Sequence, residues 1–485
     1  MGCVETELTS SVHREKGAGV ANRGAGHTGP TEISGSTVDD IVASIRALID
    51  AGSLAPGDSL PPMRSLADTL RVNRNTASAA YKALVQAGLA ETRGRAGTFI
   101  VDPYEAYEEE GFARDTVLRD VGDGNPDPAF LPRPELVRLP AAAPRLYGEP
   151  TIDPDLAEWA TTWIAADQPR PFRLTVTAGA VDAIERLLAQ TLTPGDALAV
   201  EDPCFLTSIS TIRQNGYRPV PVAMDADGML PESLAAALES GVRAVICTPR
   251  AHNPTGASLT ADRAAALREV LADYPQVLVI EDDHFSLLAR AQYASIIGDG
   301  QSRWALVRSM SKALGPDMRI ALVASDAETA ERLAARISGG ITWVSHLIQR
   351  LTVALLTDPE TQALIRRASD HYATRNAAFV DRLRVVGLTS ESRDGLNVWV
   401  DVRGDSSAVL VQLMRRGWIA RDGVTFGLER DGEHFLRLTV HGLNGEEMTR
   451  LAEDLAAAAA AVPQAATHAP ATASFFTRPE GKSQP

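Results

Sequence analysis

Short runs of β-branched and aliphatic residues alternate with Ala- and Leu-rich stretches through the centre of the chain. The runs are DALAVED, RAVICTP, QVLVIED, ALVRSM and IALVAS. Continuous apolar strands separated by helices are typical of a mainly parallel sheet with helices on both faces. Further on, the runs GLNVWVDV and HFLRLTV, with helices around them, predict a smaller α+β lobe. The pattern therefore predicts an α/β domain.

The length of the chain and its shifts in composition divide it into parts. A chain of 485 residues exceeds what one hydrophobic core usually organises. Ahead of the α/β part, apolar residues recur at helical spacing, two short helices follow, and a glycine-containing hairpin ends the segment. The acidic run YEAYEEEGFARD has no apolar face and suits a linker, while both chain ends lack apolar periodicity. We therefore expect a disordered tail (1–35), a winged helical unit (36–101), a linker (102–120), the α/β domain (121–462) and a second disordered tail (463–485).

The helical unit carries a local basic patch in a chain whose formal net charge is -15. Its helix, turn, helix and wing match the geometry in which a second helix enters the major groove of DNA. Arg74, Asn75 and Thr76 stand at the start of that helix, where side chains reach base edges or phosphates. The alternative is a protein-interaction module whose arginines only solvate its surface, because generic helix-turn-helix patterns are weak evidence.

A longer motif favours DNA binding. The segment GSLAPGDSLPPMRSLADTLRVNRNTASAAYKALVQAGLAETRGRAGTFIV resembles the N-terminal domain of the GntR family over its whole length. The shared features are the Pro-Gly bridge, an arginine opening the second helix, Arg-Asn-Thr in the recognition helix and a Gly-Thr-Phe wing. The resemblance implies a winged helix-turn-helix that contacts double-stranded DNA through Arg64, Arg74, Asn75, Thr76, Arg93 and Arg95.

The run VRSMSKALGPDMRIALV places Lys312 directly after a predicted strand, beside Ser309 and Ser311 and ahead of Arg319. Pyridoxal phosphate carries an aldehyde that a lysine amine can attack, and a phosphate that hydroxyls and an arginine can bind. This run therefore indicates a Schiff-base lysine with phosphate ligands around it. A lysine in an ordinary surface turn is the alternative.

Two polar residues at other strand ends suit the ring of the same cofactor. Asp282 ends the strand QVLVIEDD, where a carboxylate can pair with the pyridinium nitrogen, or can simply cap the following helix. Asn253, in TPRAHNPTG, can donate to the ring hydroxyl, or can belong to an ordinary Asn-Pro turn.

Three further features are weaker singly. Phe205 in EDPCF can stack on the ring, although a phenylalanine after a strand is more often core. Gly179, Ala180 and Val181 open a helix whose amides can hold phosphate, as many strand-to-helix turns can. Arg437 in HFLRLTV can bind a carboxylate, or can form an ordinary salt bridge.

Taken together, HNPTG, the strand-end aspartate and SxSK followed by an arginine resemble the class I/II aminotransferases of pyridoxal-phosphate fold type I. The resemblance implies a Schiff base on Lys312, contacts from Asp282, Asn253 and Phe205 to the ring, and phosphate binding by Ser309, Ser311, Arg319 and the Gly179–Val181 loop. It also gives Arg437 an effector carboxylate, and Tyr147 in LYGEP a phosphate contact in the neighbouring subunit.

A GntR-type head on such a domain resembles the MocR-type subfamily of regulators. The resemblance implies a homodimer that binds an operator with two half-sites and senses an amino compound or a B6 vitamer at pyridoxal 5'-phosphate. A working aminotransferase with an accessory DNA-binding head is the rival interpretation.

The sequence departs from the aminotransferase pattern twice. His284 stands in EDDHFS where the family usually has a tyrosine that contacts the ring oxygen, and we expect its imidazole to titrate near neutrality. TIDPDLAEW lacks a glycine that usually follows the Tyr-Gly segment. The first departure puts transaminase activity in doubt, and the second means that the geometry of the substrate loop cannot be carried over from the family.

No apolar run is long enough to cross a bilayer, and no export signal opens the chain. Cys3, Cys204 and Cys247 are few and far apart, which fits neither a disulfide framework nor a zinc site. We expect a cytoplasmic protein without a metal site or a membrane partner.

Overall fold

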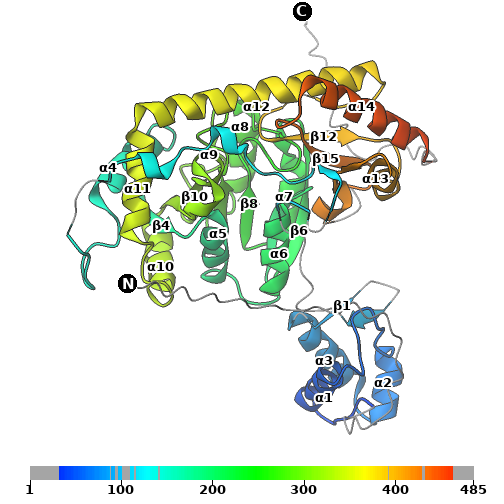
Figure 1. Cartoon of the computed structure of the whole chain (residues 1–485). Helices are drawn as coiled ribbons and strands as arrows, with labels where there is room; N and C mark the ends of the chain where they lie inside the picture. Colours follow the sequence, from blue (N-terminus) through cyan, green and yellow to red (C-terminus); the bar gives the residue numbers. More distant parts are fainter. Residues whose placement is uncertain are drawn as a thin grey trace, which may run out of the picture. The chain divides into compact units, whose positions relative to one another are not determined.

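The computed structural model describes residues 32–87, 89–92, 97–100, 110–113, 116–139, 143–391, 393–428 and 432–462. The chain forms two compact units, Met1–Asp102 and Pro103–Pro485. Figure 1 draws the first in blue and the second in cyan to red. Except for residues 32–35, the two expected tails lie outside the described residues. In the described part of the chain, no helix has both the length and the apolar character that a membrane span requires.

The first unit is a winged helix-turn-helix, as the sequence predicts. Its elements are α1 (Val38–Asp50), α2 (Met63–Leu70), α3 (Arg74–Gln86), β1 (Ala90–Thr92) and β2 (Thr98–Ile100). Thr37 and Asp40 form a capping box that fixes the start of α1, and the Asn73 side chain caps α3. The two strands pair antiparallel, and Ile45, Leu84 and Ile100 share one buried core. Local capping and one small core therefore position the recognition helix.

The second unit is built around an eight-stranded sheet of order β4-β11-β10-β9-β8-β5-β6-β7. The strands are β4 (Arg173–Thr177), β5 (Ala197–Asp202), β6 (Arg218–Asp225), β7 (Gly228–Met229), β8 (Ala244–Cys247), β9 (Leu278–Asp282), β10 (Trp304–Ser309) and β11 (Ala321–Ser325). Strands β6, β5, β8, β9 and β10 run parallel, whereas β11 pairs antiparallel with both β10 and β4. The predicted mainly parallel sheet is confirmed.

Helices cover both faces of this sheet. Alternate residues of β10 enter different cores, because successive side chains of a strand point to opposite faces. Leu306 packs in one core and Val307 in the other. The helices on the Val307 side are α5 (Ala180–Ala189), α6 (Leu206–Gln214) and α10 (Ala327–Ser338). Those on the Leu306 side are α4 (Pro154–Ala165), α7 (Pro231–Glu239), α8 (Ala261–Leu271), α11 (His346–Thr357) and α12 (Pro359–Val385).

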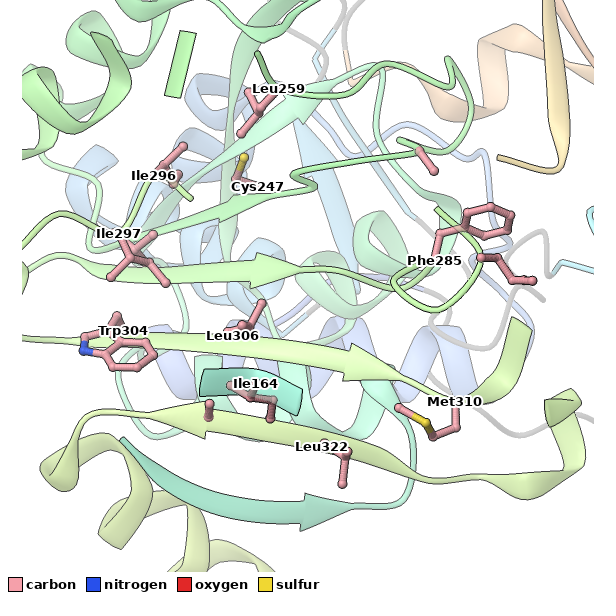
Figure 2. Close-up of a cluster of buried hydrophobic side chains, with 14 of the residues drawn as sticks. Ile164, Cys247, Leu259, Phe285, Ile296, Ile297, Trp304, Leu306, Met310 and Leu322 are labelled. Carbon is pink, nitrogen blue, oxygen red and sulfur yellow. The ribbon is translucent and has the colours of Figure 1, made fainter. Parts of the chain in front are cut away.

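Figure 2 shows part of the larger core. Ile164 of α4 lies beside Leu306 and Leu322, which come from adjacent strands of the sheet. Met310 directly follows β10 in the same core and is fully buried. Since Met310 lies between Ser309 and Ser311, its burial fixes the turn on which the predicted phosphate ligands and Lys312 stand.

A smaller lobe completes the second unit. It contains a sheet of order β12-β15-β14 and a separate parallel pair of β13 with β3. The elements are β3 (Arg119–Asp120), β12 (Asn397–Asp401), α13 (Ser406–Met414), β13 (Trp418–Ile419), β14 (Arg421–Asp422), β15 (Phe435–Thr439) and α14 (Gly445–Ala460). Val121, which follows β3, shares a core with Leu451 and Leu455 of α14.

The expected linker differs from the structure in its second half. We predicted residues 102–120 to be a linker, because the acidic run within them has no apolar face. Instead, Gly111 N donates to Asp123 O at 2.9 Å and Ala113 N donates to Asp120 Oδ2 at 2.7 Å. The described residues from Glu110 onward therefore belong to the large unit, because their polar groups find partners there that composition does not reveal.

Candidate functional site

A cavity of about 290 Å³ lies at the carboxyl ends of the central strands. Ligands of open α/β sheets bind at this edge, where loops from neighbouring strands meet. The structure brings most of the predicted cofactor residues to its wall: Ala180, Val181, Phe205, Asn253, Asp282, His284, Ser309, Ser311, Lys312 and Arg319. Residues from separate strand ends thus converge on one site.

Lys312 lies on the short helix α9 (Ser311–Leu314). Its Nζ donates to Gly124 O at 2.8 Å. Burial lowers the pKa of Lys312, and the negative charge of Glu110 opposes that shift. Lys312 is also the only lysine in the sequence between Lys82 and Lys482, a point that the order of residues alone could have revealed. Therefore any reaction that needs a lysine amine in this part of the chain falls on Lys312.

Asp282 fits a pyridine nitrogen because one of its carboxylate oxygens has no hydrogen-bond partner among the residues that the structure describes. Its side chain is buried at the end of β9, and Oδ1 has no hydrogen-bond partner among the described residues. Burial, together with the charge of Asp283, raises the pKa of Asp282 to about 7. A buried carboxyl without a partner is costly, and a protonated ring nitrogen would satisfy it. The site thus offers what pyridoxal phosphate needs.

Asp282→Asn is expected to make the cofactor-free protein more stable at pH 8 by at least about 2 °C in melting temperature. Because the pKa of Asp282 is raised in the folded protein, the stability that its bound proton gives is lost as the pH rises through about 7. Above that pH the wild type buries a charged carboxylate, whereas the Asp282→Asn variant buries a neutral amide. The gain should shrink toward pH 5, where Asp282 is protonated. Thermal unfolding at both pH values measures it.

Asp283→Asn is the matched control. Asp283 binds Arg250 and Arg308 at 2.8 Å and 3.0 Å, so its loss should destabilise the protein at both pH values. An equal gain for Asp282→Asn at pH 5 and pH 8 would contradict the assigned protonation.

The phosphate side of the cavity has a close approach between a helix start and an arginine. Gly179 precedes α5 with φ +105°, and a Cβ there would lie 3.0 Å from Arg319 Nη2. The exposed Arg319 donates to Ala178 O at 3.2 Å. The first amides of a helix, here those of Ala180 and Val181, have no acceptor within the helix and favour anions. Because Gly179 has no Cβ, the Arg319 guanidinium can lie close to the start of α5. The guanidinium and the first amides of α5 can then bind the same anion.

Arg437 is fully buried on β15, where it was predicted to bind an effector carboxylate. It donates from Nη1 to Asn253 Oδ1 at 3.0 Å and from Nη2 to Gly122 O at 2.6 Å. Both terminal nitrogens also bind the Glu110 carboxylate, with Nη2 to Oε2 at 2.7 Å. Asn253 Nδ2 donates to Glu110 Oε1 at 2.8 Å. Sequence reasoning missed Glu110, which lies in the acidic run that resembled a linker.

The protonation predicted for His284 is wrong in this structure. Burial, reinforced by the positive charge of Lys312, lowers the pKa of His284 to about 4. The imidazole is therefore neutral at physiological pH and does not titrate near neutrality. It lines the cavity, as expected of a residue beside the ring oxygen.

Tyr147 does not line the cavity of its own chain. Its side chain is 87% exposed and packs edge-on against Trp343, with ring centroids 5.4 Å apart. Its predicted contact with the cofactor of a neighbouring subunit stays a prediction.

Of the predicted DNA contacts, Arg74, Asn75 and Thr76 lie in the first turn of α3, and Arg64 lies in the first turn of α2. Arg64, Arg74 and Asn75 are exposed, and Thr76 is half-buried. Asn73 Oδ1 accepts from Asn75 N at 2.9 Å, which leaves the Asn75 side chain available. Arg93 and Arg95 lie outside the described residues.

Comparison with known families agrees with this division. Residues 37–100 match the model "Bacterial regulatory proteins, gntR family", and residues 142–455 match "Aminotransferase class I and II". The larger match covers most of the second unit.

Two relatives and one solved structure illustrate the similarity. The chain is 47% identical to the "Vitamin B6 salvage pathway transcriptional repressor PtsJ" of Salmonella typhimurium, over 87% of this chain and 98% of the relative. It is 30% identical to the "HTH-type pyridoxine biosynthesis transcriptional regulator PdxR" of Corynebacterium glutamicum, over 51% and 56% of the two chains. The multiple substrate aminotransferase of Thermococcus profundus has the same fold, with a TM-score of 0.63, 20% identity, and 72% and 94% coverage.

Proposed function

The chain belongs to the MocR-type subfamily of GntR regulators, and we propose that it represses genes of vitamin B6 metabolism in response to a ligand at a pyridoxal-phosphate pocket. The observation that carries this proposal is the buried Asp282 Oδ1, which has no hydrogen-bond partner in the described part of the chain and lies in the cavity that Lys312 also lines. The same chain holds an exposed basic recognition helix. A regulator needs both a sensor and a DNA-binding surface.

The described residues suit each part of the cofactor. Lys312 would hold the aldehyde carbon, Asp282 the ring nitrogen, Asn253 the ring oxygen and Phe205 the ring face. Ser309, Ser311, Arg319 and the amides that follow Gly179 would bind the phosphate. Bound pyridoxal phosphate supplies an electrophilic carbon that a primary amine can attack. The neutral His284 adds no charge beside the ring oxygen.

The relatives point to the effector class. One is named a repressor of vitamin B6 salvage and another a regulator of pyridoxine biosynthesis. We therefore assign a B6 vitamer as the effector, ahead of an amino acid or a simple amine. The protein would act as a homodimer, because two heads on one operator gain effective concentration that a single small head lacks.

Pyridoxal phosphate is expected to change the affinity of the full chain for DNA from its own upstream region by about 5- to 150-fold, the usual range of allosteric coupling. Fluorescence anisotropy at constant salt measures this change, because salt alone alters affinity for DNA. A scrambled duplex of equal length is the control. If the protein formed product from an amino acid and a 2-oxoacid but bound no operator specifically, the aminotransferase interpretation would replace this one.

A further inference from the structure

We propose that Glu110 is a built-in occupant of the carboxylate position at Arg437 and makes the pocket select effectors that lack a carboxylate. The inference rests on the proposed function, since it concerns the effector of the same pocket. It assigns a role to a residue that precedes the sheet and that no strand-end motif includes.

The contact is a closed, charge-assisted pair. Arg437 donates to both carboxylate oxygens of Glu110, in the two-pronged geometry with which arginine binds a free carboxylate. Asn253 adds a third hydrogen bond to Glu110, at 2.8 Å. Glu110 lines the same cavity as Lys312 and Asp282, so it belongs to the pocket itself.

The backbone around the pair is shaped to admit it. Gly124 has φ +66°, and a Cβ there would lie 2.4 Å from Glu110 Oε2 and 2.9 Å from Arg437 Nη2. Any other residue would therefore press on both partners. The carbonyl of Gly124 also accepts the Lys312 amine, which ties this turn to the reactive nitrogen.

The segment that carries Glu110 is held beside the pocket. Gly111 N donates to the carbonyl of Asp123, and Ala113 N donates to the side-chain carboxylate of Asp120, so both bonds anchor the residues that follow Glu110. The side chain therefore reaches Arg437 from a fixed base, and a competing ligand must act against a partner that is already in place.

Charge decides which ligands the pocket accepts. Burial opposes ionisation of Glu110, but Arg437 outweighs it and lowers the pKa of Glu110 to about 2. Glu110 is thus negative at physiological pH. A second carboxylate at Arg437 would place two negative charges on one guanidinium, whereas an aldehyde or amine without a carboxylate meets no such repulsion. B6 vitamers belong to this second class.

The test compares L-alanine with ethylamine, which retains the amine and lacks the carboxylate. Binding of each to the full-length, cofactor-loaded protein is followed by calorimetry and visible absorbance. Glu110→Ala is expected to tighten L-alanine binding by about 10-fold or more and to leave ethylamine binding within about 2-fold, because the apparent affinity of a ligand scales with the fraction of sites that are open to it. Glu110→Gln, which keeps the shape and loses the charge, should give a smaller gain.

Two controls isolate the pair. Glu149→Ala removes a carboxylate that forms an ion pair with Arg145 elsewhere on the unit, and should leave the binding of both L-alanine and ethylamine unchanged. The double variant Glu110→Ala with Arg437→Ala should lose the gain for L-alanine.

The inference is overturned if L-alanine binds the wild type and both Glu110 variants with equal affinity. It is also overturned if the Glu110 variants tighten the binding of ethylamine as much as that of L-alanine. A gain that persists without Arg437 also overturns it. Cofactor content, read from absorbance in the same samples, reports separately on the proposed function. A protein without cofactor whose L-alanine binding still tightens in Glu110→Ala would contradict that function and support the role of Glu110.

Discussion

Lys312→Ala is expected to abolish covalent attachment of pyridoxal phosphate and to remove the visible absorbance band of the purified protein. The reason is that, among the described residues, Lys312 is the lysine that lines the cavity. Lys312 is the only lysine between Lys82 and Lys482, and its Nζ lies in the cavity with Asp282. Burial lowers the pKa of Lys312, which favours the neutral amine that attacks an aldehyde.

The measurement is an absorbance spectrum before and after borohydride reduction, followed by mass mapping of the labelled peptide. Lys82→Ala, on the recognition helix, is the matched control and should keep the full band. A reducible band of unchanged intensity in Lys312→Ala would refute the assignment of this lysine.

Arg74→Ala is expected to weaken operator binding by about 1–3 kcal/mol, the cost of removing a specific base contact. Arg74 is exposed on the first turn of α3, where side chains of a recognition helix reach base edges. If Arg74 reads a base, the loss should be confined to one operator position. If it binds a phosphate, the loss should be uniform, and the slope of affinity against salt should fall by about one.

Anisotropy titrations with operator variants at several salt concentrations separate these results. Arg46→Ala, an exposed arginine on α1, is the matched control and should change binding little. The large unit alone, beginning at Pro103, should lose specific binding. Operator affinity equal to that of the full chain in this fragment would show that the DNA-binding surface lies elsewhere.

Patterns among neighbouring residues in the sequence were enough to predict the strands and the residues at their ends. Asp282 and Ser309 end β9 and β10, which are parallel neighbours, so their places follow once the strands are recognised. The capped helices of the first unit were predictable for the same reason, since Thr37, Asp40 and Asn73 act within a few residues.

Pairs that are distant in sequence could not be predicted. Glu110 and Arg437 are separated by 327 positions, and nothing in an acidic run shows that one carboxylate folds onto a buried guanidinium. The bonds of Arg250 and Arg308 to Asp283 were missed for the same reason. The protonation of His284 depends on burial and on Lys312, which the sequence around EDDHFS does not contain.

The pairing of β3 with β13 has a consequence for synthesis of the chain. In the core of the small lobe, Val121 precedes the strands of the large sheet in the sequence. The other residues of this core, up to Ala458, follow those strands. Translation therefore delivers one part of this core early and α14 last, and such long-range contacts form slowly. The core of the first unit, in contrast, is complete at Ile100. Because domains fold in order of synthesis, the DNA-binding head is able to fold on the ribosome before Arg437 has been translated.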